Sequence, residues 1–175
     1  MKKLIVFLSK RTSFKEVIAL AFPLVVSSSA WTIQHFVDRM FLAWHSTESV
    51  AASMPAGMTN MLTMSVFIGT AIFTETFVAQ YFGAKQFGKI GAVVWHGIYI
   101  GIIGAIVHFL LIPFAPSFFH LIGHAENVSS LETVYFQTLC FGAFPVISSA
   151  AISGFFAGRG KTKPLMFATI FQTCI

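Results

Sequence analysis

The sequence predicts an all-α membrane protein, a polytopic helix bundle with four complete transmembrane helices and the start of a fifth. Hydrophobic residues make up 56% of the 175 residues and charged residues only 10%, whereas a soluble domain carries about 25% charged residues. Apolar runs of the length that crosses a bilayer alternate with short polar turns. The net charge of +5 does not indicate nucleic-acid binding, because the basic residues are scattered over short loops.

The chain begins with a predicted cytoplasmic or interfacial segment, residues 1–15. It is basic, but its apolar run, residues 4–8, is too short for the core of a signal peptide. The first span is predicted over residues 16–44, followed by a polar turn at 45–49.

The second span is predicted over residues 50–82 and is longer than a bilayer requires, so we expect tilt or a kink near Pro55 and Gly57. One stripe at helical spacing consists of methionines: Met54, Met58 and Met61. A polar and aromatic stripe with an acid beside it follows: Thr63, Phe67, Thr70 and Thr74, with Glu75.

The third span is predicted over residues 90–113, where Gly97 and Gly101 have the small-xxx-small spacing of close helix contacts. A loop over residues 116–130 follows, which could include an interfacial turn through Phe118, Phe119 and Leu121. A fourth span is predicted over residues 131–157.

The last stretch is a basic loop at 158–164 and a fifth span over residues 165–175. That span holds only about half of the 20 residues needed to cross a bilayer. We therefore expect the chain to be the front part of a longer protein.

The distribution of charged residues among the loops indicates how the chain is oriented in the membrane. Lysine and arginine occur before span one, between spans two and three, and between spans four and five, while the other two loops hold glutamates and no Lys or Arg. This alternation predicts a cytoplasmic N-terminus.

Asp38 is the most informative residue, because a carboxylate within a membrane span costs about 2.5–3.5 kcal/mol on insertion scales and usually serves a function. Helical spacing places Trp31, Gln34 and Asp38 on one stripe with His35 beside it. Two alternatives stay open. Asp38 and Arg39 could sit together at the membrane interface, with Arg39 reaching water, and Gln34 and His35 could simply be satisfied by a neighbouring helix.

No motif predicts an enzyme or a metal centre. The spacing of His120 and His124 supplies two imidazoles at most, and a metal site needs further ligands. Cys140 and Cys174 lie in apolar stretches, where we expect small buried side chains, and no phosphate loop or hydrolase motif occurs. No cofactor is therefore expected.

Four motifs together resemble one family. They are Pro-Leu at 23–24, Phe-Val-Asp at 36–38, VAQ-x-x-GA at 78–84, and G-x-x-x-G-x-G-x-x-x-P at 154–164. Spread over nearly the whole chain, they resemble multidrug and toxic compound extrusion (MATE) transporters.

The resemblance implies that the chain is the partial N-terminal lobe of a twelve-helix transporter with two six-helix lobes. It also implies a multi-pass protein of the plasma membrane that exports cationic or amphipathic compounds in exchange for H⁺ or Na⁺. The implied partners are the lipid bilayer, small organic cations, the coupling cation and the remainder of the transporter chain.

The resemblance places Asp38 in a cation-linked cavity, where it would take up a proton outside and release it inside, with Gln34 and Glu75 as further cation-coupling candidates. Glu75 departs from the family pattern and could lie on the pathway or near the cytoplasmic interface; Arg39 departs from it too. The candidates for the substrate pathway are Trp31, His35, Met54, Met58, Met61, Phe67 and Thr70, although ordinary helix packing explains each of the aromatic and methionine residues taken singly.

Two other functions are consistent with the sequence. One is a lipid-linked oligosaccharide flippase of the same superfamily, whose cavity would carry more Arg and Lys than Arg39 alone. The other is a membrane scaffold or subunit with no transport of its own.

Overall fold

The computed structural model describes residues 14–173, and all regular structure in that range is helical, which confirms the all-α fold class. The predicted N-terminal segment up to residue 13 and Cys174 lie outside the described residues. The helices are α2 (Phe14–His45), α3 (Thr47–Gly83), α4 (Phe87–Leu111), the 3-10 turn η1 (Ile112–Phe114), α5 (Ala115–Ile122), α6 (Glu126–Phe141), α7 (Ala143–Ala157) and α8 (Thr162–Thr173).

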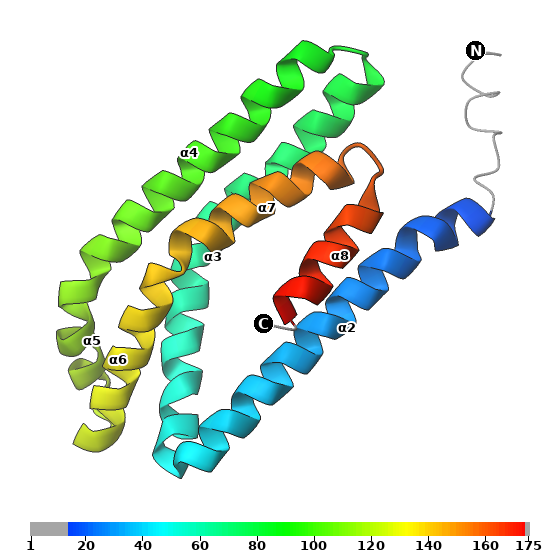
Figure 1. Ribbon diagram of the computed structural model, residues 1–175. Helices are drawn as coiled ribbons and strands as arrows, with labels where there is room; N and C mark the ends of the chain where they lie inside the picture. The colour runs from blue at the N-terminus through cyan, green and yellow to red at the C-terminus, as the bar shows by residue number, and fades with distance from the viewer. Residues whose placement is uncertain (1–13, 174–175) are drawn as a thin grey trace.

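The helices form two groups (Figure 1). Helix α3 packs against α4, α6 and α7, whereas α2 pairs with α8 beside that group. The two groups join at the α2–α3 turn, where Ser46 caps α3 by accepting a 3.0 Å hydrogen bond from the Ser49 backbone N–H. An N-cap of this kind satisfies one of the free N–H groups of the first helical turn.

By length and apolar composition, two helical segments among the described residues could cross a membrane, namely Thr47–Gly83 and Phe87–Ile122. The pair α6 and α7 makes a third if it is taken as one bent span. Helix α3 runs unbroken through Pro55 and Gly57.

The fourth span differs from its prediction over residues 131–157. It begins at Glu126 and consists of two helices that meet at Gly142 with a 45° bend. The start was placed too late because the first turn of α6 is polar, although Glu126 suits the positive end of the helix dipole. Helix α8 begins at Thr162, three residues before the predicted start of the fifth span, because Pro164 is tolerated in the first turn of a helix.

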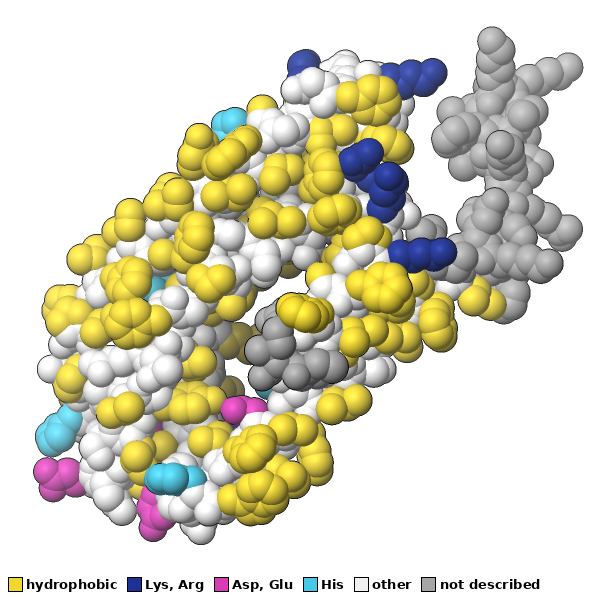
Figure 2. All heavy atoms as spheres, in the orientation of Figure 1, with side chains coloured by type: hydrophobic (Ala, Val, Ile, Leu, Met, Phe, Trp, Pro, Cys, Tyr) yellow, Lys and Arg dark blue, Asp and Glu magenta, His cyan; other side chains and the backbone are white. Residues whose placement is uncertain are grey.

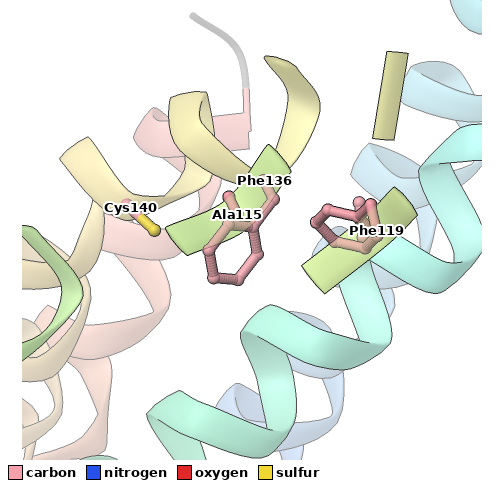
Figure 3. Packing of buried hydrophobic residues seen from close by; sticks show 5 residues of the cluster. Ala115, Phe119, Phe136 and Cys140 are labelled. Carbon is pink, nitrogen blue, oxygen red and sulfur yellow. The ribbon is translucent and has the colours of Figure 1, made fainter. Parts of the chain in front are cut away.

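The predicted loop over residues 116–130 is wrong in its first half, which forms α5. Phe119 of this helix is fully buried, and its ring lies 5.7 Å from that of Phe136 on α6. Figure 3 shows these rings with Ala115 and Cys140, which belong to the same buried cluster. Burial of a phenylalanine contributes about 1.5–3 kcal/mol, which holds α5 against the bundle.

Small residues bring α4 and α7 close together. Gly97 and Gly101 are buried, and a Cβ atom on either would collide with α7, at Ala151 and Ser148 respectively. This is the close contact that the small-xxx-small spacing predicts.

Candidate transport site

The facing sides of α2 and α8 form an open groove of about 430 Å³. It is lined by Ser27, Ser28, Trp31, Thr32, His35 and Thr169. The rings of Trp31 and His35 meet edge to face at 5.5 Å. Hydroxyl groups and amphipathic rings on one wall suit a ligand that is partly apolar and partly polar.

Two hydroxyls of this wall, those of Ser27 and Thr32, bond to the backbone of α2 itself. Ser27 donates to the Pro23 carbonyl at 2.9 Å, and Thr32 donates to the Ser28 carbonyl at 3.1 Å. Side-chain bonds of this kind to the helix backbone allow these two hydroxyls to border the groove.

Asp38 lies one helical turn beyond His35, and its exposed side chain meets α6. The hydroxyl of Tyr135 on α6 lies near the Asp38 carboxylate and interacts with it electrostatically. Sequence reasoning missed Tyr135, although a hydroxylated aromatic residue inside an apolar span is the kind of signal that could have drawn attention to it. Asp38 thus combines exposure with a hydroxyl group nearby, which suits a group that exchanges a cation.

Arg39 points to a different helix from Asp38. Its Nη1 donates a 3.1 Å hydrogen bond to the Ser53 Oγ on α3, and the buried Ser53 donates in turn to the Val50 carbonyl at 2.8 Å. Among residues 14–173 the Arg39 guanidinium makes no ion pair with Asp38. The alternative that Asp38 and Arg39 both lie at the membrane interface, with Arg39 reaching water, stays a prediction, because it concerns depth in the membrane and not contact between the two side chains.

The other predicted site residues do not converge on Asp38. Gln34 and Thr70 are exposed, and the Thr70 hydroxyl donates to the Val66 carbonyl of its own helix at 2.7 Å. The methionine stripe lies largely opposite the buried face of α3, with exposed fractions of 53%, 70% and 74% for Met54, Met58 and Met61. Glu75 is exposed as well, and its backbone contacts Gly154 of α7.

Phe67 belongs to a polar and aromatic contact between α3 and α4. Its ring lies 6.0 Å from the ring of His108, which is fully buried. His108 Nδ1 is 2.7 Å from the Gly104 carbonyl, which assigns the donor to Nδ1, and Nε2 is 3.1 Å from the Thr63 hydroxyl. Phe67 and Thr63 therefore help to join two helices within the bundle.

One acidic group, in the first half of α6, is buried, unlike Asp38 and Glu75. Glu132 is fully buried, and its Oε1 lies 2.7 Å from Nδ1 of His124. This partner explains His124 without a metal, and the described residues contain no cluster of three or more metal-binding side chains.

A comparison with known families places this geometry in context. The family model described as MatE matches residues 23–175. The chain belongs to the MatE family. Its membership confirms the resemblance drawn from the four sequence motifs.

Relatives in this family carry names that refer to resistance and detoxification. The chain is 28% identical over 159 residues to a "Probable multidrug resistance protein NorM" of Synechocystis sp., covering 91% of this chain and 34% of that protein. It is 27% identical over 163 residues to "Protein DETOXIFICATION 7" of Arabidopsis thaliana, covering 91% and 32%. The chain thus spans about a third of the length of these curated relatives.

A solved structure shares the fold. It is a MOP superfamily transporter from Pyrococcus furiosus, whose title reports a reverse polarity of its binding pocket that suggests a different function. The TM-score is 0.83 at 21% sequence identity, over 91% of this chain and 36% of that one. At this identity the likeness shows the fold of the helix bundle alone. Membership of the MatE family and the long apolar helices indicate a multi-pass membrane protein.

Proposed function

We propose that this chain forms part of a secondary transporter that exports cationic or amphipathic toxic compounds across the plasma membrane in exchange for H⁺ or Na⁺. The observation that carries the proposal is Asp38, an exposed carboxylate inside a helix, with the Tyr135 hydroxyl nearby and a polar and aromatic groove beside it. Membership of the MatE family and the names of the relatives support the substrate class.

A change in the charge of Asp38 would couple ion binding to a change in conformation. A proton or Na⁺ bound at Asp38 neutralises or shields the carboxylate, which weakens its hold on the Tyr135 hydroxyl. The contact between α2 and α6 then differs between the ion-bound and ion-free states. A ligand shifts a conformational equilibrium only through such a differential interaction.

The flippase alternative requires cationic side chains in the cavity to hold phosphate groups. Arg39 is bound to Ser53 instead, and Figure 2 shows the visible Lys and Arg side chains at one end of the molecule. Both observations favour the antiporter, so we retain it as the single proposal.

The test uses the full-length protein in liposomes with a fluorescent organic cation, under an imposed proton gradient or sodium gradient. We expect Asp38→Asn to reduce gradient-driven dye movement to that of protein-free liposomes, because the amide keeps the shape of the side chain but cannot bind the cation. Glu48→Gln, which removes a carboxylate from the first turn of α3, is the matched control and is expected to transport normally.

Transport by Asp38→Asn at the wild-type rate under both gradients would refute the role of Asp38. Absence of gradient-driven movement in the wild-type protein would favour the scaffold alternative. Comparison of the two gradients identifies the coupling ion.

A further inference from the structure

Two turns at one end of the bundle bring basic side chains together. The α3–α4 turn contains Lys85, whose backbone has a φ of 57°, and the α7–α8 turn contains Gly160 with a φ of 70°. Arg159 bridges the turns, because its guanidinium lies 4.9 Å from the ring centre of Phe155 and 5.7 Å from that of Phe82 at the end of α3. Contacts of this kind fix the guanidinium plane.

The charge of this end is not balanced by the described protein residues. The set comprises Lys85, Lys89, Arg159, Lys161 and Lys163, and Figure 2 shows Lys and Arg side chains gathered over this part of the surface. Within residues 14–173, none of these five cations forms an ion pair with an acidic side chain. Several cations without an acidic partner at one end of the bundle attract an anion.

Arg159 also carries an unsatisfied donor. Its Nε is buried and has no hydrogen-bond partner among the described residues. A buried polar group without a partner is destabilising, and the planar guanidinium fork matches the geometry of a phosphate. The guanidinium of Arg159 is therefore held in place by the two rings, without an acidic partner among the described residues.

Exposed aromatic rings beside the cations indicate that the anion belongs to a lipid rather than to a free ion. Phe82 is 38% exposed and Phe87 is 58% exposed, and their rings pair at 5.6 Å next to Lys85. Helix α4, with 25 residues, is about 37 Å long, so a turn at its end reaches the headgroup region when the helix crosses a hydrocarbon layer of about 30 Å. Cations next to exposed aromatic rings at this depth fit a phosphate that is attached to acyl chains.

We infer that Arg159, Lys85 and Lys161 bind the phosphate headgroup of an anionic phospholipid, with Phe82 and Phe87 against the start of its acyl chains. The site needs a membrane but does not depend on the proposed transport activity. It lies at the end of the bundle, away from Asp38 and its groove.

Native mass spectrometry of the full-length protein tests this site, after release from nanodiscs that contain equal amounts of phosphatidylglycerol and phosphatidylcholine. We expect wild-type protein to retain phosphatidylglycerol preferentially. Arg159→Gln should lower that retention about fivefold, since one basic residue near an anionic surface contributes about 1 kcal/mol. Lys163→Gln removes a charge from the first turn of α8 without a ring contact in the structure, and should have a clearly smaller effect.

A second variant keeps the test independent of folding. Lys85→Gln/Lys161→Gln changes two exposed side chains, and we expect it to lose phosphatidylglycerol at least as strongly as Arg159→Gln while its melting temperature in pure phosphatidylcholine stays that of the wild type. Retention equal to wild type in both variants would overturn the inference. Equal losses in Lys163→Gln and Arg159→Gln would also overturn it, because they would indicate diffuse surface charge.

A further experiment distinguishes a site for a lipid from a site for a free anion. Inorganic phosphate at millimolar concentration should leave the bound phosphatidylglycerol in place, because a free ion gains nothing from the exposed rings. Displacement by phosphate would show an ion site and refute the lipid assignment.

Discussion

Asp38 and Arg39 are adjacent in the sequence, yet their side chains leave α2 toward different helices. Successive residues of a helix differ by about 100° in direction, which allows Asp38 to meet α6 while Arg39 meets α3. The arginine has a protein partner in Ser53 and helps to fix the α2–α3 corner. The aspartate has a hydroxyl group nearby and an exposed side chain, which leaves it accessible to a cation.

Tyr135→Phe tests the partner of Asp38. A hydroxyl group that donates to a charged group contributes about 1.5–3 kcal/mol, so its loss frees the carboxylate to bind the coupling ion more tightly by about tenfold or more. We expect half-maximal dye efflux at a correspondingly lower coupling-ion concentration. Tyr99→Phe on α4, an exposed tyrosine, is the control and should leave the ion dependence unchanged. An unchanged dependence in Tyr135→Phe would contradict the assigned contact.

At the residue scale, the sequence predicts which side chains share a face of one helix. It does not predict which side chains on different helices meet. The helical period alone places Trp31, Gln34 and Asp38 on one stripe with His35 beside it. In the structure Trp31 and His35 line the groove, whereas Gln34 and Asp38 are not among its lining residues. Tyr135 could not be paired with Asp38, because nothing local in either stretch encodes how α6 lies against α2. Helical spacing predicts that the three methionines share one face of α3, but it does not predict whether that face is buried or exposed.

Helix α7 shows how small residues decide packing between elements. Gly154 faces α3 so closely that a Cβ atom there would lie 2.8 Å from the backbone nitrogen of Glu75. Backbone atoms cannot rotate away as a flexible side chain can. The close approach of α3 and α7 therefore depends on the absence of a side chain at this position.

Gly154→Ala should destabilise the bundle, since overpacking at such a contact costs about 1–3 kcal/mol. Gly91→Ala in α4 is the matched control, because nothing lies within 4 Å of the added methyl group and alanine favours a helix over glycine by about 0.8–1.0 kcal/mol. Thermal unfolding of both variants in the same detergent measures the difference. A melting temperature of Gly154→Ala at or above that of wild type would contradict the close α3–α7 contact.

Element boundaries were predictable where apolar runs begin and end sharply, and less so where a helix starts in polar sequence. The helices predicted for the first three spans lie within a few residues of α2, α3 and α4. Of these, α2 is not among the described segments that are long and apolar enough to cross a membrane, which are Thr47–Gly83 and Phe87–Ile122. The start of α6 and the whole of α5 were missed, because polar residues and prolines in a short stretch resemble a loop. Burial of Phe119 against α6 is a tertiary effect that overrides this local signal.

At the scale of the whole molecule, charge separates the two ends of the bundle. The visible Lys and Arg side chains gather near the α3–α4 and α7–α8 turns, whereas most of the visible acidic side chains lie at the opposite end (Figure 2). Composition and loop charges were sufficient to predict this polarity, because it depends on the order of spans and not on how they pack.

This distribution of charge predicts that the basic end of the bundle faces the cytoplasm. The accessibility of single cysteines to a labelling reagent tests this orientation. In a variant lacking Cys140 and Cys174, Gln86→Cys marks the basic end and Ser117→Cys the opposite end; both positions are exposed and uncharged, so the basic residues that set orientation are kept. A membrane-impermeant maleimide added to intact cells should label Ser117→Cys and spare Gln86→Cys until the cells are permeabilised. Labelling of Gln86→Cys alone in intact cells would mean the opposite orientation, and it would place the inferred lipid site in the outer leaflet.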